Sequence, residues 1–184
     1  KHYANKDVQR ISQAIEVCKK AHGHQIRADG SPYSDHPIAV ATILAEWHGD
    51  ADTLIAGLLH DTLEDTDLSS EQIAKKFGEP VKDLVEGVTK FTVADVQHDH
   101  RLDRKTETLR KMFETMRRDI RVAIIKLADR LHNVRTIDSL SEERQKRFAQ
   151  ETIDIYYKLA ERLGMNDVRR ELGDHCMPIL KPKE

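Results

Sequence analysis

The sequence has few aromatic residues and few of the residues that form turns. Phe, Trp and Tyr together make up 5% of its 184 residues, and it contains 8 Gly and 5 Pro. Sandwiches and barrels depend on many turns and many β-branched residues, so this composition argues against them. Charged residues, by contrast, make up 34%. The balance favours a helical protein, and the length suits one domain that can bury a sizeable core.

The sequence also has few cysteines, a small net charge and no long apolar run. The two cysteines, Cys18 and Cys176, form no ligand-spaced pair, which predicts free thiols in a reducing compartment. A formal net charge of -2 gives no general attraction to nucleic acid or to an anionic membrane. No apolar run reaches the about 18 residues of a membrane-spanning helix, and no signal pattern opens the chain. We therefore predict a cytoplasmic protein with no nucleic-acid or membrane partner.

Most of the chain follows the helical period, with apolar residues recurring three and four positions apart. A capping box formed by Ser69 and Gln72 opens one short helix, which Gly78 closes. The turn-rich segment 28–35 is a predicted loop, and 91–104 is a predicted mobile loop because its periodicity is weak. The sequence therefore predicts a single all-α domain over residues 1–184. Its other helices are expected at about 7–22, 36–48, 51–64, 79–89, 105–117, 119–134, 141–163 and 166–177.

The segment 119–134 is apolar over most of its circumference, which predicts a buried, central helix. Four polar residues nevertheless share one stripe of it, at i, i+3, i+4 and i+7: Lys126, Asp129, Arg130 and Asn133. Unpaired charges are very unfavourable in a low-dielectric interior, so these side chains must have partners. The stripe is therefore either an internal salt-bridge network or the wall of a polar cavity.

The stretch GLLHDTLEDT, residues 57–66, begins as an apolar helix and then carries four ionisable residues: His60, Asp61, Glu64 and Asp65. On a helix, His60 lies one turn before Glu64, and Asp61 lies one turn before Asp65. Gly57 stands three residues before His60. It either leaves room above this polar cluster or allows two helices to pack closely.

An imidazole and a carboxylate together suit a divalent ion such as Mn²⁺, Fe²⁺ or Zn²⁺. His60 and Asp61 cannot complete such a site alone. His36, at the start of a predicted helix, and Asp129, in the buried helix, are candidates for the two missing ligands. Taken singly, each has an ordinary structural explanation, such as a partly buried histidine or half of an ion pair. Taken together, the four residues favour a metal site.

Glu64 and Asp65 follow the candidate ligands within one helical turn. A divalent metal lowers the pKa of water toward neutrality, and a nearby carboxylate can hold that water or move its proton. The structural alternative is a solvated helix end. Acidic residues at a helix C-terminus oppose the helix dipole, which favours the functional interpretation.

Four longer motifs resemble one family. GSPYSDHPIAVATIL, AGLLHDTLEDT and IIKLADRLHNVRT closely resemble the hydrolase domain of RelA/SpoT enzymes, which are HD phosphohydrolases that degrade ppGpp and pppGpp. ETIDIYYKLAERLGM is similar to the segment that closes that domain, and the resemblance spans about residues 7–172. It implies a helical bundle of the HD type and hydrolysis of the 3′-pyrophosphate to GDP or GTP and pyrophosphate. In extent the chain resembles a free-standing small alarmone hydrolase, like the metazoan SpoT homologue.

The resemblance also implies roles for individual residues. One Mn²⁺ would be bound by His36, His60, Asp61 and Asp129, and Glu64 and Asp65 would be the catalytic pair acting on the attacking water. The implied contacts with the guanine nucleotide come from Arg27, which packs on the base, and from Asn133, Thr136 and Tyr156. These four also have structural alternatives: a surface charge, caps of the buried helix, or the core.

The sequence departs from the family pattern beside Arg27. Many bacterial relatives carry Arg-Lys-Ser-Gly where this chain has Arg27-Ala28-Asp29-Gly30. Losing that lysine and gaining Asp29 removes positive charge near a polyanionic substrate. A phosphohydrolase of another nucleotide, such as NADPH, would share the same motifs. A non-catalytic alarmone sensor is the other alternative, although every implied ligand and acid is present. An apolar face among the last two predicted helices could support a homodimer.

Overall fold

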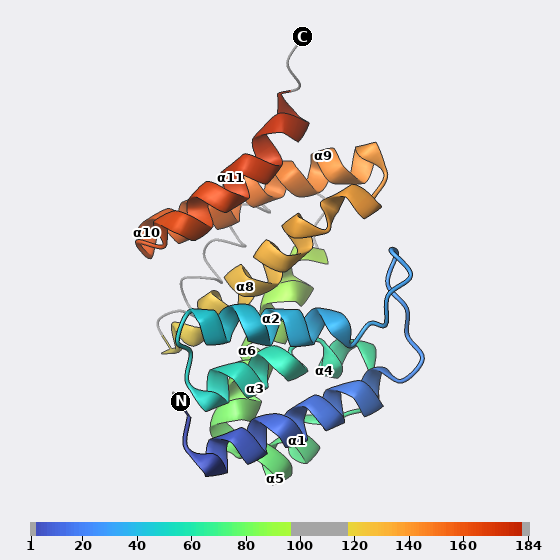
Figure 1. Cartoon of the computed structure of the whole chain (residues 1–184), viewed down its shortest axis with the longest axis vertical. Coiled ribbons are helices and arrows are strands. Elements are labelled where there is room, and N and C mark those ends of the chain that lie inside the picture. Colours follow the sequence, from blue (N-terminus) through green and yellow to red (C-terminus); the bar gives the residue numbers. More distant parts are fainter. Residues whose placement is uncertain (1–2, 97–117, 182–184) are drawn as a thin grey trace. The chain divides into compact units, whose positions relative to one another are not determined.

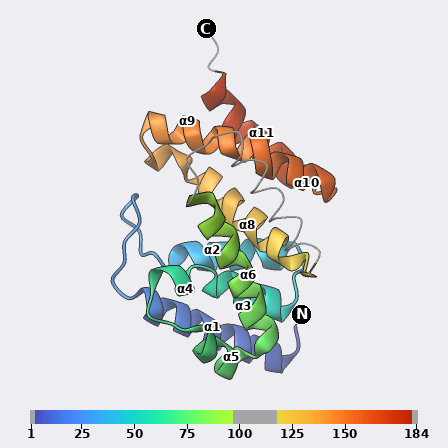
Figure 2. The ribbon, with the colours of Figure 1, turned by 180° about the vertical axis from the view of Figure 1, so that it is seen from behind.

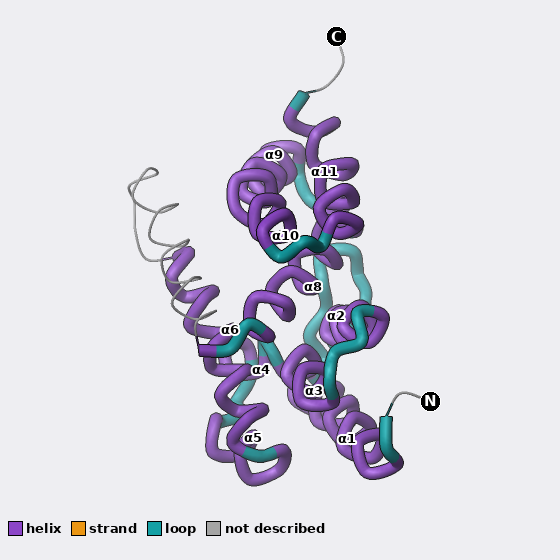
Figure 3. The backbone as a smooth tube through the Cα atoms, turned by 90° about the vertical axis from the view of Figure 1, so that its left-hand side faces the viewer, coloured by secondary structure: helices purple, strands orange, loops and turns teal. Residues whose placement is uncertain are grey.

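The computed structural model describes residues 3–96 and 118–181, and of 90–96 it describes the backbone alone. All the regular elements in these ranges are helical, apart from an isolated antiparallel bridge between Ile26 and Pro32 (Figures 1 and 3). The prediction of an all-α protein is confirmed. The elements are α1 (Asn5–His22), α2 (Asp35–Glu46), α3 (Ala51–Leu59), α4 (Thr62–Asp65), α5 (Ser70–Phe77), α6 (Glu79–Val96), α8 (Arg121–Arg135), η1 (Ile137–Ser139), α9 (Glu142–Glu151), η2 (Thr152–Tyr157), α10 (Lys158–Arg162) and α11 (Asn166–Leu180).

Two expected loops have different outcomes. The segment 28–35 is a loop up to the start of α2, as the sequence predicts. In the second, residues 91–96 continue α6 as helix, so the prediction of a loop is wrong there. The mixed polarity of FTVADV hid its helical period, yet it contains no Gly or Pro that would end a helix. Residues 97–104 and the predicted helix 105–117 lie outside the described residues.

The chain forms two compact units, Lys1–Ala128 and Asp129–Glu184, and the boundary falls inside α8. In the first unit α3 packs against α1, α2 and α6 (Figures 2 and 3). Eight of its nine residues are buried for this reason, all except Asp52. The capping box predicted for α5 is present, with the Ser69 and Gln72 side chains each bonded to the other's backbone N–H.

The start of α8 is attached to the start of α3. Asp50, the N-cap of α3, accepts a hydrogen bond from the Thr53 backbone N–H at 2.8 Å. Its second carboxylate oxygen accepts one from the Arg121 guanidinium at 2.9 Å. Arg121 also donates to Asp119, which precedes α8. These charge-assisted bonds fix where α8 begins relative to the central helix of the first unit.

In the second unit, α9, η2 and α10 form one continuous helical run, and α11 packs against it. The predicted helix 141–163 therefore matches in extent, but residues 152–157 have π-helical geometry. The Thr152 hydroxyl donates to the Phe148 carbonyl at 2.8 Å at this point. A side-chain bond of this kind competes with the regular backbone hydrogen bonds of the helix. Within the described residues, no helix combines the length and apolar character needed to cross a membrane.

Gly57 lies where α3 packs closely against α2. A Cβ atom at this position would lie 2.5 Å from Leu44 Cδ1 and within 4 Å of Val40 and Ala41. Leu44 is fully buried, so its side chain has little room to move away. Of the two explanations for this glycine, close helix packing is therefore the one that the structure supports.

Gly57→Ala is expected to lower the free energy of unfolding by about 1–3 kcal/mol, because it overpacks a filled core. Urea denaturation measures this change. Leu44→Ala alone should cost about 2–5 kcal/mol through the cavity it leaves. The double variant should lose less than the sum of the two, since the added methyl fills part of that cavity. Strict additivity would show that the methyl does not meet Leu44.

Candidate metal centre

His36 reaches the site from the start of α2, directly after the loop 28–35. The loop is closed by a hydrogen bond from the Arg27 backbone N–H to the Ser31 carbonyl and by the Ile26–Pro32 bridge. Gly30 has φ +84°, a left-handed conformation that favours glycine. His36 is 2% exposed, and its backbone N–H donates to the Tyr33 carbonyl. The loop thus delivers an imidazole into the protein interior.

His60 stands where the predicted helix 51–64 is interrupted, between α3 and α4. The Thr62 hydroxyl donates to the Leu59 carbonyl at 2.7 Å, and His60 Nδ1 lies 2.8 Å from the Gly57 carbonyl oxygen. These side-chain bonds compete with helical backbone bonds and explain the break. A carbonyl oxygen only accepts, so Nδ1 carries the hydrogen, and the Nε2 of a neutral His60 presents a lone pair. His60 is 1% exposed.

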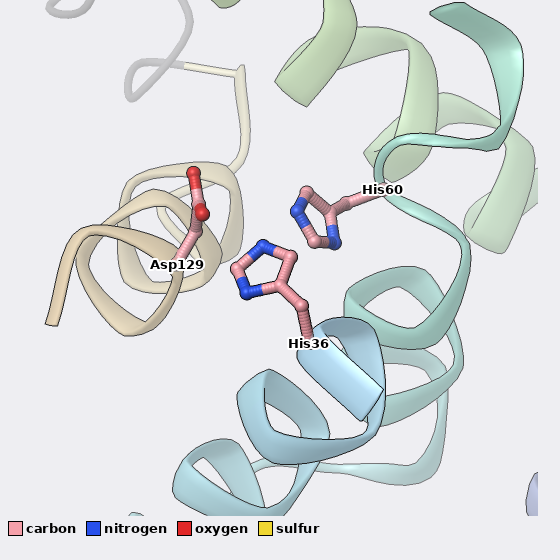
Figure 4. Close-up of side chains that lie close together, drawn as sticks. All are labelled: His36, His60 and Asp129. Carbon is pink, nitrogen blue, oxygen red and sulfur yellow. The ribbon is translucent and has the colours of Figure 1, made fainter. Parts of the chain in front are cut away.

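Asp129 approaches the two histidines from α8. It follows Ala128 directly on this continuous helix, whose first residue, Arg121, is bonded to Asp50. One ligand atom from each of His36, His60 and Asp129 lies within 4.8 Å of the others. Figure 4 shows the three side chains pointing toward one another from α2, from the turn after α3 and from α8. These are three of the four ligands that the sequence names as candidates, and the structure brings them together.

Asp61, the fourth expected ligand, contacts both histidines. Its Oδ1 lies 3.0 Å from His60 Nε2, and its Oδ2 lies 3.8 Å from His36 Nε2. The first contact places a carboxylate oxygen against the lone pair of a neutral imidazole, and two acceptors repel at this distance. A cation between them, either a proton or a metal ion, removes the repulsion. Two imidazoles and two carboxylates are also a set that divalent transition metals accept, so these residues fit such an ion.

Asn133 supports the carboxylate of Asp129. Its side-chain amide donates to Asp129 Oδ1 at 2.6 Å, one helical turn away on α8. Partners of this kind orient a metal-binding carboxylate and leave its other oxygen for the ion. In this structure Asn133 therefore holds a candidate ligand, in addition to the nucleotide contact expected from its position.

The polar residues on α8 were expected to form either an internal salt-bridge network or the wall of a polar cavity, and the structure contains examples of both. Arg130 donates to Glu151 at 2.7 Å, and its guanidinium lies 4.2 Å and 4.0 Å from the ring centroids of Phe148 and Tyr156. This residue belongs to an internal network of the second unit. Asp129 instead belongs to the group of candidate ligands. Adjacent positions on one helix thus serve a structural network and a polar site.

The two expected catalytic residues, Glu64 and Asp65, lie on the short helix α4, and both are exposed. The Asp65 carboxylate accepts a hydrogen bond from the Tyr33 hydroxyl at 3.1 Å, and its carbonyl accepts one from the Gln25 side chain at 2.7 Å. Asp65 is therefore fixed at both its backbone and its side chain. Carboxylates exposed beside a candidate metal site can accept a proton from water.

Sequence reasoning missed Tyr33 as a site residue. Its hydroxyl also donates to Asp61 Oδ2, at 2.9 Å. Burial raises the pKa of Tyr33 well above its usual value, and the negative charges of Asp61 and Asp65 raise it further, so the phenol stays protonated. Its position three residues before His36 in GSPYSDHP is the available signal, but the turn-forming residues around it predict only a loop.

The residues expected to contact substrate make different contacts in the structure. The Arg27 guanidinium lies 6.0 Å from the centroid of the Tyr33 ring. The Thr136 hydroxyl donates to carbonyls at the end of α8, as a cap would, and Tyr156 is 1% exposed within η2. Hydrogen bonds from Ser31 keep the pKa of the neighbouring Asp29 below its usual value, so Asp29 stays ionised beside Arg27.

A family model described as HD domain matches residues 14–166. The chain belongs to the HD domain family. The family model covers all the candidate ligands and both acidic residues of α4.

Individual relatives of this HD chain agree with the resemblance to RelA/SpoT-type enzymes. A "GTP pyrophosphokinase" of Streptomyces coelicolor is 47% identical over 96% of this chain and 20% of its own length. A "probable guanosine-3′,5′-bis(diphosphate) 3′-pyrophosphohydrolase" of Synechocystis is 48% identical over 94% of this chain and 22% of its own. The chain thus spans about a fifth of the length of these relatives. A solved structure of a metazoan SpoT ortholog, described as hydrolysing ppGpp, matches 94% of both chains with 28% identity and a TM-score of 0.65.

Proposed function

We propose that this HD domain hydrolyses the 3′-pyrophosphate of ppGpp or pppGpp with Mn²⁺ as its metal, releasing pyrophosphate and leaving GDP or GTP. The observation that carries the proposal is the approach of His36, His60 and Asp129 to within 4.8 Å of one another. The names of the Synechocystis relative and of the metazoan SpoT ortholog support the substrate. The relatives from Streptomyces coelicolor and Synechocystis are matched over similarly small shares of their own lengths, 20% and 22%. Hydrolysis is preferred because the metazoan SpoT ortholog, described as hydrolysing ppGpp, is matched over 94% of its length.

A divalent cation held by the two histidines and two aspartates would polarise a phosphoryl oxygen and lower the pKa of a water molecule toward neutrality. Neighbouring groups orient two of these ligands before any ion binds. The bond from His60 Nδ1 to the Gly57 carbonyl directs the Nε2 lone pair into the site, and Asn133 holds one oxygen of Asp129. Fixed ligands of this kind do not have to reorganise when the ion binds.

Glu64 and Asp65 would act on the attacking water. In the proposed step, water attacks the phosphorus attached to the 3′ oxygen, and one of its protons passes to the Glu64 carboxylate. The bond between that phosphorus and the ribose oxygen breaks, and the ribose oxygen takes up a proton from solvent water. Arg27 would contact the guanine base through its planar guanidinium, as such groups do on aromatic faces. Because Asp29 stays ionised beside Arg27, the substrate phosphates would be attracted less strongly there.

The decisive experiment incubates the metal-depleted protein with ppGpp, pppGpp and NADPH in turn, each with and without added Mn²⁺, Fe²⁺ or Zn²⁺. We expect Mn²⁺-dependent release of pyrophosphate from ppGpp or pppGpp, faster than any turnover of NADPH. Phosphate and pyrophosphate are quantified separately, and the nucleotide products are identified by chromatography. Faster turnover of NADPH would replace the proposed substrate. Binding of ppGpp without turnover under every metal would indicate a sensor instead of an enzyme.

A further inference from the structure

The hydroxyl of Tyr33 contacts two carboxylates that have different expected roles. It lies 2.9 Å from Asp61 Oδ2 and 3.1 Å from Asp65 Oδ2. Asp61 is an expected metal ligand and also contacts both histidines, whereas Asp65 is an expected catalytic residue on α4. A phenol has one hydrogen to donate, so the two carboxylates share it and are drawn toward one point.

The ring of Tyr33 is held in place by its neighbours. It stacks on the ring of His22, with centroids 4.6 Å apart and planes 27° apart, and meets His36 edge-on at 6.3 Å. His22 is itself 2% exposed, and its Nδ1 lies 2.9 Å from Gln25 Oε1. The amide of Gln25 then donates to the backbone carbonyl of Asp65 at 2.7 Å. The side chain and the backbone of Asp65 are therefore fixed by groups that support one another.

We propose that Tyr33 is a positioning residue that holds the ligand carboxylate of Asp61 and the catalytic carboxylate of Asp65 in a fixed relation through one hydroxyl group. It acts through these two residues and touches no reacting atom. Its effect on metal binding depends only on the candidate metal centre. Its effect on turnover rests on the proposed function.

The experiment combines Tyr33→Phe, Asp65→Asn and the double variant. Tyr33→Phe keeps the ring that stacks on His22 and removes only the hydroxyl. The affinity for Mn²⁺ is titrated in the absence of nucleotide, by the loss of the free-ion signal in electron paramagnetic resonance. The turnover number for ppGpp is measured at saturating Mn²⁺ and substrate. Tyr3→Phe is the matched control, because Tyr3 donates one comparable hydrogen bond, to the Gly49 carbonyl at 2.7 Å, in the same unit.

Removing an outer partner of a metal ligand typically lowers affinity or activity by about 10–100-fold. Tyr33→Phe should therefore raise the Kd for Mn²⁺ about tenfold, both in the native background and with Asn at position 65. It should lower kcat by about tenfold or more in the native background, with little change in KM. With Asn at position 65 it should lower kcat no further, because at saturating Mn²⁺ its effect on turnover passes through Asp65, which has already been changed. Tyr3→Phe should change neither quantity.

Two results would overturn the proposal. An unchanged Kd for Mn²⁺ in Tyr33→Phe would show that the hydroxyl does not position Asp61. An equal fractional loss of kcat in both backgrounds would show that the effect on turnover does not pass through Asp65. If the unaltered protein hydrolyses no ppGpp, the proposed function fails, yet the Mn²⁺ titration still decides the role of Tyr33 at Asp61. Circular dichroism melting curves confirm that the variants compared are folded.

Discussion

His60→Ala is expected to abolish metal-dependent turnover of ppGpp. Its Nε2 faces the Asp61 carboxylate at 3.0 Å and lies among the candidate ligand atoms of His36 and Asp129. A metal ion stabilises the transition state of such reactions by several kcal/mol, and each 1.36 kcal/mol corresponds to a factor of ten. We therefore expect kcat/KM to fall by roughly 10³-fold or more. Metal content after dialysis, measured by mass spectrometry, should fall in parallel.

The matched control for this variant is His24→Ala. His24 is an exposed histidine just after α1, so its loss removes an imidazole without removing a candidate ligand. It should retain the metal content and the turnover of the unaltered protein. His60→Ala that still bound one ion per chain with normal affinity would remove His60 from the ligand set. Melting curves are needed beside both measurements, because a buried side chain is being truncated in one case and an exposed one in the other.

Glu64→Gln is expected to reduce turnover strongly while leaving the metal in place. Glutamine has nearly the shape of glutamate but cannot accept the proton of the attacking water. General acid–base groups contribute about 10²–10⁴-fold to enzymatic rates, so kcat should fall by that order. Since Glu64 is exposed, the free energy of unfolding should change by no more than about 0.5 kcal/mol. Steady-state kinetics, metal analysis and urea denaturation test the three parts separately.

Glu46→Gln makes the same chemical change at another exposed position, the last residue of α2, and should leave all three measurements unchanged. If Glu64→Gln also retained full activity, the proton would have to pass to another group, and Asp65 would be the nearest candidate in sequence. If it lost both activity and metal, Glu64 would instead be supporting the ligands. The two failures point to different corrections of the mechanism.

The sequence was sufficient for the helical class, because helical periodicity is visible over short stretches. Residue chemistry also named His36, His60 and Asp129 as candidate ligands, but the packing that brings them together depends on contacts between distant segments. It was insufficient where a side chain decides between two local structures. The break between α3 and α4 depends on the bonds from His60 and Thr62 to backbone carbonyls, which helical periodicity does not register.

The role of Tyr33 was also beyond sequence reasoning. A tyrosine in a turn-rich segment has no feature that distinguishes a solvent-exposed ring from one that reaches two carboxylates. That distinction depends on contacts with His22 and Asp65, which are distant in the chain. Likewise, the polar stripe on α8 predicted partners for Arg130 without showing that they would be Glu151 and the ring of Tyr156. Such pairings are set by tertiary packing.

The absence of a side chain at Gly57 has a consequence beyond the stability of the core. This glycine sets how near α2 and α3 can come, and these helices carry His36 and the turn that presents His60. Its carbonyl oxygen also fixes which nitrogen of His60 bears the hydrogen. The spacing of the two imidazoles thus depends in part on hydrocarbon contacts one turn away from the candidate ligands. A larger residue at position 57 is therefore expected to alter the preference of the site among ions as well as the packing of the core.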